Sequence, residues 1–149
     1  PYRTEFFDYL NDSDIELGKD LLLLNTVEDE EIPILYHAAD SLLFPSVKEG
    51  WGLVVLEAMA SGLPVLTSDI PVFKEYLQHR KNAIMVNAED ESSIASGIVT
   101  LAIDIKLKQQ LSSSGPKTAK LYSWERTGEE HIEYYYELIS EISSQPFIE

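Results

Sequence analysis

The sequence contains no cysteine and few basic residues, and each shortage excludes a class of function. Without cysteine there is neither a disulfide framework nor a thiolate metal site, which fits a reducing compartment. The 11 Lys and Arg residues are outnumbered by 26 Asp and Glu residues, so the formal charge is −15. Because such a charge repels polyanions, a nucleic acid partner is not expected.

The sequence also lacks long apolar runs. None approaches the roughly 18 residues of a membrane span, and no signal-peptide pattern opens the chain. We therefore expect a cytoplasmic protein with no membrane span. Pro1 stands first with no Met before it, which fits a processed or cut product of a longer chain.

Short apolar runs alternate with longer amphipathic segments along the 149 residues, of which 44% are hydrophobic. The short runs predict strands at residues 20–25, 41–45, 64–69 and 82–87. The longer segments predict helices at residues 28–40, 52–61, 72–78, 91–101, 104–122 and 123–143. Such alternation predicts an α/β fold, a Rossmann-like doubly wound parallel sheet with helices on both faces.

The length is that of one typical domain. We therefore expect a single domain over residues 1–149, with an α/β core at 19–90 and a helical part at 91–149. Within the helix at 28–40, one apolar stripe should pack on the core; it consists of Ile34, Leu35 and Ala38. The SSSGP segment at 112–116 resembles a helix breaker.

A pair of glycines lies where a phosphate would bind in such a fold. Ligands of doubly wound sheets sit beyond the carboxyl ends of the strands, at helix N-termini. The loop after the strand at 41–45 carries Gly50 and Gly52 and leads directly into the helix at 52–61. Glycine lets the backbone approach a ligand, and the free amides of a first helical turn attract phosphate.

Glu57 is the one charged residue in that helix, which is apolar nearly all round and should be buried. A buried carboxylate needs a partner or a cavity. Helical side chains lean toward the N-terminus, so Glu57 should point back toward the phosphate site and accept hydrogen bonds from ribose hydroxyls. Each feature alone has a structural explanation, but together they favour a phosphate-bearing small molecule.

The stretch LYHAADSLLFPSVKEGWGLVVLEAMASGLPVLTSDIPVFKEYL, residues 35–77, closely resembles the carboxyl-terminal, donor-binding lobe of retaining GT-B glycosyltransferases of the group 1 or family 4 type. The hallmark of that family is two glutamates separated by seven residues, matched here by Glu49 and Glu57. The similarity continues through NAIMVNAED at 82–90 and YSWERTGEEHIEYYYELI at 122–139.

The resemblance assigns roles to residues of this chain. Glu49, the candidate catalytic residue, would hold hydroxyls of the donor sugar and would not act as a nucleophile. The sugar and its diphosphate would bind at the amides of Gly50, Trp51, Gly52 and Leu53. Glu57 would take the ribose hydroxyls. The nucleotide base would be flanked by Asn25, Thr26 and Val27.

The resemblance also implies a reaction. A sugar would pass from a nucleotide sugar, a UDP- or GDP-sugar, to an acceptor hydroxyl with retention of configuration, in glycan or polysaccharide synthesis. No cofactor and no metal are expected, because amides and basic side chains stabilise the leaving diphosphate in such enzymes. A glycan or lipid-linked acceptor would contact the amino-terminal lobe, and the full-length enzyme could lie at a membrane surface.

The sequence departs from the family in two respects. No segment matches the amino-terminal lobe, and the basic residues that the family supplies to the diphosphate are not recognisable before Asp20. We therefore expect a chain that binds the donor weakly and is inactive alone. The alternative is an intrinsically short protein that pairs with a separate partner lobe.

Three other interpretations stay open. The chain could be a non-catalytic partner or scaffolding domain that keeps the fold. It could be a flavodoxin-like regulator, although no acidic cluster at strand ends supports that. The DSD triplet at 12–14 has the form of a metal site of single-lobe transferases but follows no apolar strand, and the basic cluster at 79–81 is interpreted as a solvated turn.

Overall fold

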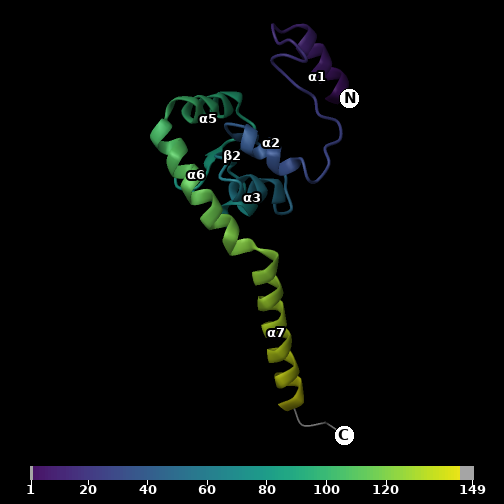
Figure 1. Ribbon diagram of the computed structural model, residues 1–149, viewed down its shortest axis with the longest axis vertical. Helices are drawn as coiled ribbons and strands as arrows, with labels where there is room; N and C mark the ends of the chain where they lie inside the picture. The colour runs from purple at the N-terminus through teal and green to yellow at the C-terminus, as the bar shows by residue number, and fades with distance from the viewer. Residues whose placement is uncertain (1, 145–149) are drawn as a thin grey trace. The chain divides into compact units, whose positions relative to one another are not determined.

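The computed structural model describes residues 2–144 of the chain (Figure 1). Its internal contacts divide the chain into two compact units, Pro1–Ile32 and Pro33–Glu149. The first unit begins with helix α1 (Tyr2–Asn11), which is followed by a loop without regular structure. Within residues 2–144, no helix has the length and hydrophobicity needed to cross a membrane.

The predicted strand at residues 20–25 is wrong. Leu21 forms only an isolated bridge with Leu17, and the three leucines that follow, Leu22, Leu23 and Leu24, lie exposed in a coil. A continuous apolar run becomes a strand when neighbouring strands supply hydrogen bonds and helices cover both faces. Among the described residues, no named strand pairs with this run.

The second unit contains a parallel sheet, as predicted. Its strands are β1 (Leu42–Phe44), β2 (Val65–Ser68) and β3 (Ile84–Val86), in that spatial order. Leu66 of β2 stands between Leu43 on one side and Ile84 on the other. All four residues of β2 are buried, because β2 is the central strand and helices cover both of its faces. The predicted α/β fold and the other three predicted strands are therefore confirmed.

The predicted helices of the second unit are present with shifted ends. They are α2 (Ile32–Ala38), α3 (Leu53–Ala60), α4 (Pro71–Lys74), α5 (Glu91–Ile103), α6 (Ile105–Ala119), the 3-10 turn η1 (Lys120–Tyr122) and α7 (Trp124–Ser144). Helix α2 is shorter than the predicted 28–40, and its proposed apolar stripe is wrong. Ile34 and Leu35 are exposed, and the α2 side chain that packs on the core is that of Tyr36.

Two apolar clusters cover the two faces of the sheet. One joins β2 to α3 and α4 through Val65, Met59 and Phe73. The other joins β2 and β3 to α5 and α6 through residues that include Leu66, Ile84, Leu101 and Leu111. Because successive strand residues point to opposite faces, Val65 and Leu66 fall in different clusters. The predicted placement of helices on both faces is thus confirmed.

Two glycines let helices approach closely. Gly97 of α5 lies against the sheet, where an added Cβ would come within 2.6 Å of Leu66 Cδ1. Gly115 of α6 lies against α3, where a Cβ would meet the Met59 carbonyl oxygen at 3.0 Å. The expected breaker at 112–116 therefore does not split α6, which continues through Pro116 to Ala119. Gly115 serves the packing of α3 on α6.

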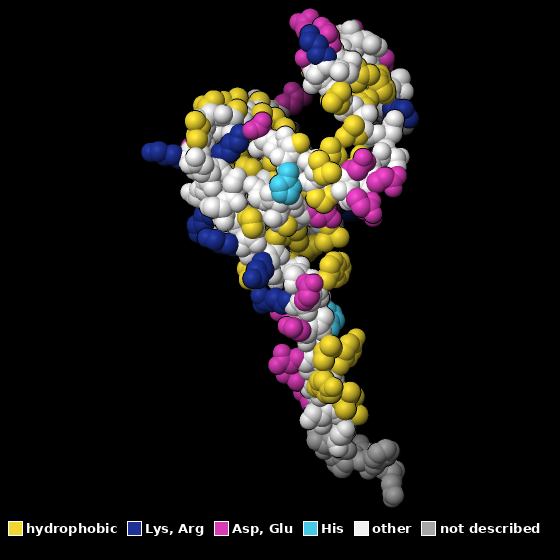
Figure 2. Space-filling model, viewed as in Figure 1, with side chains coloured by type: hydrophobic (Ala, Val, Ile, Leu, Met, Phe, Trp, Pro, Cys, Tyr) yellow, Lys and Arg dark blue, Asp and Glu magenta, His cyan; other side chains and the backbone are white. Residues whose placement is uncertain are grey.

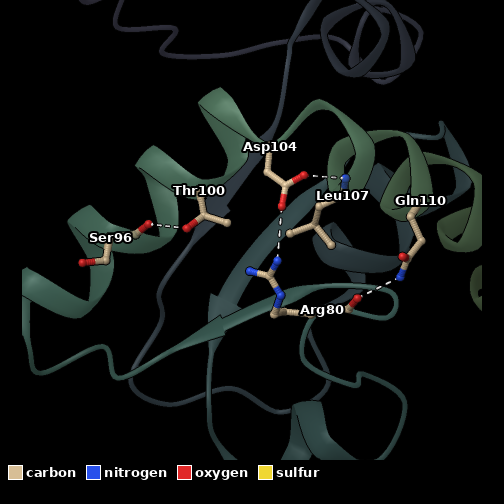
Figure 3. A network of polar contacts seen from close by, with 6 residues as sticks. All are labelled: Arg80, Ser96, Thr100, Asp104, Leu107 and Gln110. Carbon is tan, nitrogen blue, oxygen red and sulfur yellow. Dashed lines mark hydrogen bonds and ion pairs between the residues drawn. The ribbon is translucent and has the colours of Figure 1, made fainter.

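The start of α6 is tied to the loop before β3 (Figure 3). Asp104 accepts a hydrogen bond from the Leu107 amide at 3.0 Å and so caps the helix. Its second oxygen pairs with Arg80 Nη2 at 3.2 Å, and Gln110 donates to the Arg80 carbonyl at 2.8 Å. Arg80 of the basic cluster is thereby paired with the start of α6, while its side chain stays about half exposed.

Helix α7 carries hydrophobic and acidic side chains along opposite edges (Figure 2). The exposed hydrophobic residues of the helix include Ile132, Tyr135, Tyr136, Ile139 and Ile142. Its acidic residues include Glu130, Glu133 and Glu137. The predicted amphipathic helix at 123–143 is confirmed, and within residues 2–144 its apolar edge faces outward.

Candidate functional site

The loop between β1 and α3 places the predicted phosphate turn at the carboxyl end of the sheet. Strand β1 ends at Phe44 and α3 begins at Leu53, with Gly52 as its N-cap. Gly52 has φ +82°, and a Cβ there would lie 2.5 Å from Phe73 Cε1. Its conformation and its surroundings therefore both require glycine. Around Gly50, by contrast, a Cβ would meet nothing within 4 Å, so the turn is open to a ligand on that side.

Hydrogen bonds hold the loop to the sheet. The hydroxyl of Ser68, at the end of β2, donates to the Ser46 carbonyl, and the Ser46 hydroxyl donates to the Lys48 carbonyl at 3.2 Å. At the other end, the Val55 amide donates to the Gly52 carbonyl at 2.9 Å and starts the helix. Ahead of Val55, the amides of the first helical turn have no acceptor within the helix, an arrangement that favours a bound anion.

Helix α3 ends as predicted at Gly62. The Gly62 amide donates to the Met59 carbonyl and the Leu63 amide donates to the Ala58 carbonyl, both at 3.0 Å. Gly62 has φ +75°, so these bonds form a Schellman motif. The helix is therefore defined at both ends by glycines, and its eight residues carry the turn and Glu57 as one rigid element.

An aromatic cluster supports the turn from the segment just after α4 and from η1. The Tyr76 hydroxyl donates to the Trp51 carbonyl at 3.0 Å. The Trp51 ring lies 5.3 Å from the Tyr76 ring and 5.5 Å from that of Tyr122. Burial, followed by the negative charge of Glu49, raises the pKa of the Tyr76 hydroxyl, so this group stays a donor. Glu49, itself partly buried, thus lies near enough to Tyr76 to act on it electrostatically.

Glu57 is exposed, so the expectation that it is buried is wrong. Helix α3 buries Val55, Leu56, Ala58 and Met59, while Leu53, Val54 and Glu57 remain on an open side. The expectation of a partner is confirmed, because the Tyr36 hydroxyl of α2 donates to Glu57 Oε2 at 3.0 Å. Burial, the hydrogen bond to Glu57 and the Glu57 charge together raise the pKa of Tyr36 to about 12.

Glu57 also lines a cavity, as expected. The cavity has a volume of about 660 Å³ and lies between α3 and the junction of α6 with α7. Its lining residues are Trp51, Leu53, Leu56, Glu57, Ala60, Pro116, Ala119, Lys120, Tyr122, Ser123, Trp124 and Thr127. Three of the predicted site residues, Trp51, Leu53 and Glu57, therefore share one hollow. Lys120 and the rings of Tyr122 and Trp124 line it with them.

The other predicted residues lie elsewhere. Glu49, Gly50 and Gly52 belong to the same turn before α3, but none of the three lines this cavity. Asn25, Thr26 and Val27 lie in the coil of the first unit, and their role at a base stays a prediction. Residues 12–14 follow α1 in a turn, where the Ser13 hydroxyl donates to the Leu10 carbonyl at 2.9 Å. Across residues 2–144 no three His, Cys, Asp or Glu side chains gather as metal ligands would.

Sequence reasoning missed the tyrosines that support the site. Tyr36 and Tyr76 each make one hydrogen bond to a predicted site residue, and Tyr122 stacks beside Trp51. A tyrosine with a buried ring needs a partner for its hydroxyl, and that is the one signal that could have singled them out. The partner itself could not be named, because it lies 21 residues away from Tyr36 and 25 from Tyr76.

Comparison with known proteins shows the family to which this chain belongs. The sequence pattern of the family described as "Glycosyl transferases group 1" matches residues 9–118. An uncharacterized glycosyltransferase of Methanocaldococcus jannaschii is 33% identical over 131 residues, which are 86% of this chain and 34% of that protein. The O-antigen chain mannosyltransferase RfbU of Salmonella typhimurium is 46% identical over 85 residues, which are 57% of this chain and 24% of that protein.

Solved structures share the fold. Sucrose-phosphate synthase from Thermosynechococcus elongatus superposes with a TM-score of 0.82 at 23% identity, over 93% of this chain and 35% of that one. Anabaena HepE in complex with UDP-glucose superposes with a TM-score of 0.71 at 24% identity, over 79% of this chain and 32% of that one. This chain thus spans about a third or less of each of these four proteins. With its glycine turn, paired glutamates and parallel sheet, it belongs to the group 1 glycosyltransferases and has the fold of one GT-B lobe.

Proposed function

We propose that residues 1–149 form part of the donor-binding lobe of a retaining glycosyltransferase. The lobe takes a nucleotide sugar, from which the sugar passes to an acceptor hydroxyl in glycan or polysaccharide synthesis. One observation carries this proposal: a turn with Gly52 at φ +82° opens α3 one turn before Glu57, and the residues on either side of Gly52, Trp51 and Leu53, line the same cavity as Glu57. The donor class agrees with the UDP-glucose held by the HepE structure.

Each part of the donor is assigned to its own group of residues. The amides of Gly50, Trp51, Gly52 and Leu53 at the positive end of α3 bind the diphosphate and part of the sugar. Glu57 accepts hydrogen bonds from the ribose hydroxyls, with the Tyr36 hydroxyl holding one of its oxygens. Glu49, at the start of the turn, accepts hydrogen bonds from sugar hydroxyls. As this binding uses amides, the proposal requires no metal ion.

Catalysis needs more than this chain. The relatives that it matches are about three times as long or longer, and we propose that the remaining length holds the acceptor. We therefore propose weak donor binding and no transfer by residues 1–149 alone. Supplying the missing lobe as a second chain is expected to restore transfer only if both lobes close on one donor molecule.

Calorimetric titration of the chain with UDP-, GDP- and ADP-sugars tests the proposal. One nucleotide is expected to bind, with an affinity that EDTA leaves unchanged and that Glu57→Ala lowers at least about tenfold, since a hydrogen bond to a charged group is lost. Glu133→Ala is the matched control, because Glu133 is likewise an exposed helical glutamate, on α7 and outside the cavity. Equal binding by wild type and Glu57→Ala would contradict the assigned role of Glu57.

The scaffolding interpretation gives a different result in the same experiment. A non-catalytic domain that keeps the fold would unfold cooperatively in urea yet bind no nucleotide sugar. It would also tolerate Glu57→Ala without any change in partner binding. A donor affinity that depends on Glu57 would therefore separate the two.

A further inference from the structure

Tyr76 is a buried residue that contacts the backbone of the turn before α3 and does not line the cavity. Its side chain is 6% exposed and packs against Phe73 and Tyr122, with ring centroids 6.2 and 5.6 Å away. Its hydroxyl reaches the Trp51 carbonyl at 3.0 Å and would lie 3.3 Å from a Cβ on Gly52. A side chain so placed cannot contact a ligand directly and can act only through the backbone of the turn.

The hydrogen bond to Trp51 has a geometric consequence for the next residue. The Trp51 carbonyl and the Gly52 amide belong to one planar, trans peptide group, so they point in opposite directions. Since Tyr76 binds the carbonyl, the N–H of Gly52 is directed away from Tyr76. Gly52 has no side chain and φ +82°, so no Cβ at that residue restricts the rotation of this peptide.

We propose that Tyr76 is a positioning residue that orients the Trp51–Gly52 peptide, and with it the Gly52 amide, for a diphosphate at the start of α3. This inference rests on the proposed function and adds to it the group that shapes the anion site. Preorganised amides bind an anion without a cost of reorganisation, so the loss of orientation appears as a loss of affinity.

The cluster around Tyr76 supplies a matched control. The Tyr122 ring packs at an inclined angle against those of Trp51 and Tyr76, with centroids 5.5 and 5.6 Å away. Across residues 2–144 the structure gives its hydroxyl no hydrogen bond, whereas the Tyr76 hydroxyl has one. Tyr76→Phe and Tyr122→Phe thus each remove one hydroxyl from the same cluster. Only Tyr76→Phe also removes a hydrogen bond to the turn.

Hydrogen exchange followed residue by residue tests the positioning without any ligand. In Tyr76→Phe the amides of residues 51–54 are expected to exchange faster than in the wild type, while the amides of α5 stay unchanged. Tyr122→Phe is expected to leave residues 51–54 at the wild-type rate. Unchanged exchange at residues 51–54 in a folded Tyr76→Phe variant would overturn the inference.

Titration with UDP-glucose and with uridine tests the consequence for binding. Tyr76→Phe is expected to weaken UDP-glucose about three- to tenfold, as loss of one neutral hydrogen bond implies, and to leave uridine binding unchanged. An equal loss for uridine would indicate a general structural defect and overturn the positioning role. If the wild type binds no nucleotide, the proposed function fails for this chain, while the exchange experiment still decides whether Tyr76 orders the turn.

Discussion

Both units of the chain contain short apolar runs, yet they use them differently. In the first unit, Leu22, Leu23 and Leu24 are exposed. In the second, Val65 and Leu66 are fully buried between two layers of helices. The difference lies in what surrounds each run, because β2 has a strand on each side and the run at 20–25 has none among residues 2–144.

The comparison teaches that an apolar run specifies a strand only together with its neighbours. β2 gains hydrogen bonds from β1 and β3 and apolar contacts on both faces. The sheet also positions the candidate site: β1 leads into the glycine turn, and the Ser68 hydroxyl of β2 donates a hydrogen bond to the loop. Stability and ligand binding should therefore be concentrated in the second unit.

The largest effect is expected from Leu66→Ala. Leu66 is 0% exposed at the centre of the sheet, so the substitution leaves a cavity that should cost about 2–5 kcal/mol. The free energy of unfolding in urea measures this loss. A cost below about 1 kcal/mol would break the comparison, because it would place β2 outside a tightly packed core.

A loss of similar or somewhat smaller size is expected from Gly52→Ala. An alanine at this position would have to keep φ +82°, and its Cβ would lie 2.5 Å from Phe73 Cε1. Together, backbone strain and overpacking should cost about 2–4 kcal/mol. Urea unfolding measures the cost, and titration should show nucleotide binding abolished. Gly50→Ala is the control, since a Cβ at Gly50 meets nothing within 4 Å.

A smaller effect is expected from the Tyr36–Glu57 hydrogen bond at alkaline pH. The pKa of Tyr36 is raised from 10.0 to about 12, so between these values the folded state binds more protons than the unfolded state. The stability from this shift is complete below pH 10 and is lost as pH rises toward 12. Urea midpoints measured from pH 8 to 11 should thus fall more steeply for the wild type than for Tyr36→Phe.

Tyr134→Phe is the control for that experiment, because Tyr134 is exposed on α7 and has no contact with Glu57. It should follow the wild-type dependence on pH. Parallel curves for the wild type and Tyr36→Phe would show that the hydrogen bond to Glu57 does not persist in solution.

The smallest effect is expected in the first unit. Leu23 is 44% exposed in a coil, so Leu23→Ala should change the free energy of unfolding by less than about 0.5 kcal/mol. The same urea experiment as for Leu66→Ala measures it. A loss above about 1 kcal/mol would mean that Leu23 is covered, and would remove the contrast between the two runs.

Local patterns predicted most of the fold. The strands at 41–45, 64–69 and 82–87 were recognisable from short apolar runs, and Gly62 marked the end of α3 because a left-handed residue is needed there. The error at 20–25 came from the same rule, which cannot see whether a neighbouring strand exists. For the site, the glycine turn and Glu57 were recognisable, but the exposure of Glu57 was not.

The sequence by itself determined the parallel α/β fold, the glycine turn at the start of α3 and the family of the chain, because these depend on periodicity and on residues close together in the chain. Only the tertiary structure decided which groups support the turn. Tyr36 and Tyr76 reach Glu57 and Trp51 across 21 and 25 residues. Contacts of that kind follow from how helices pack on a sheet, which no local pattern contains.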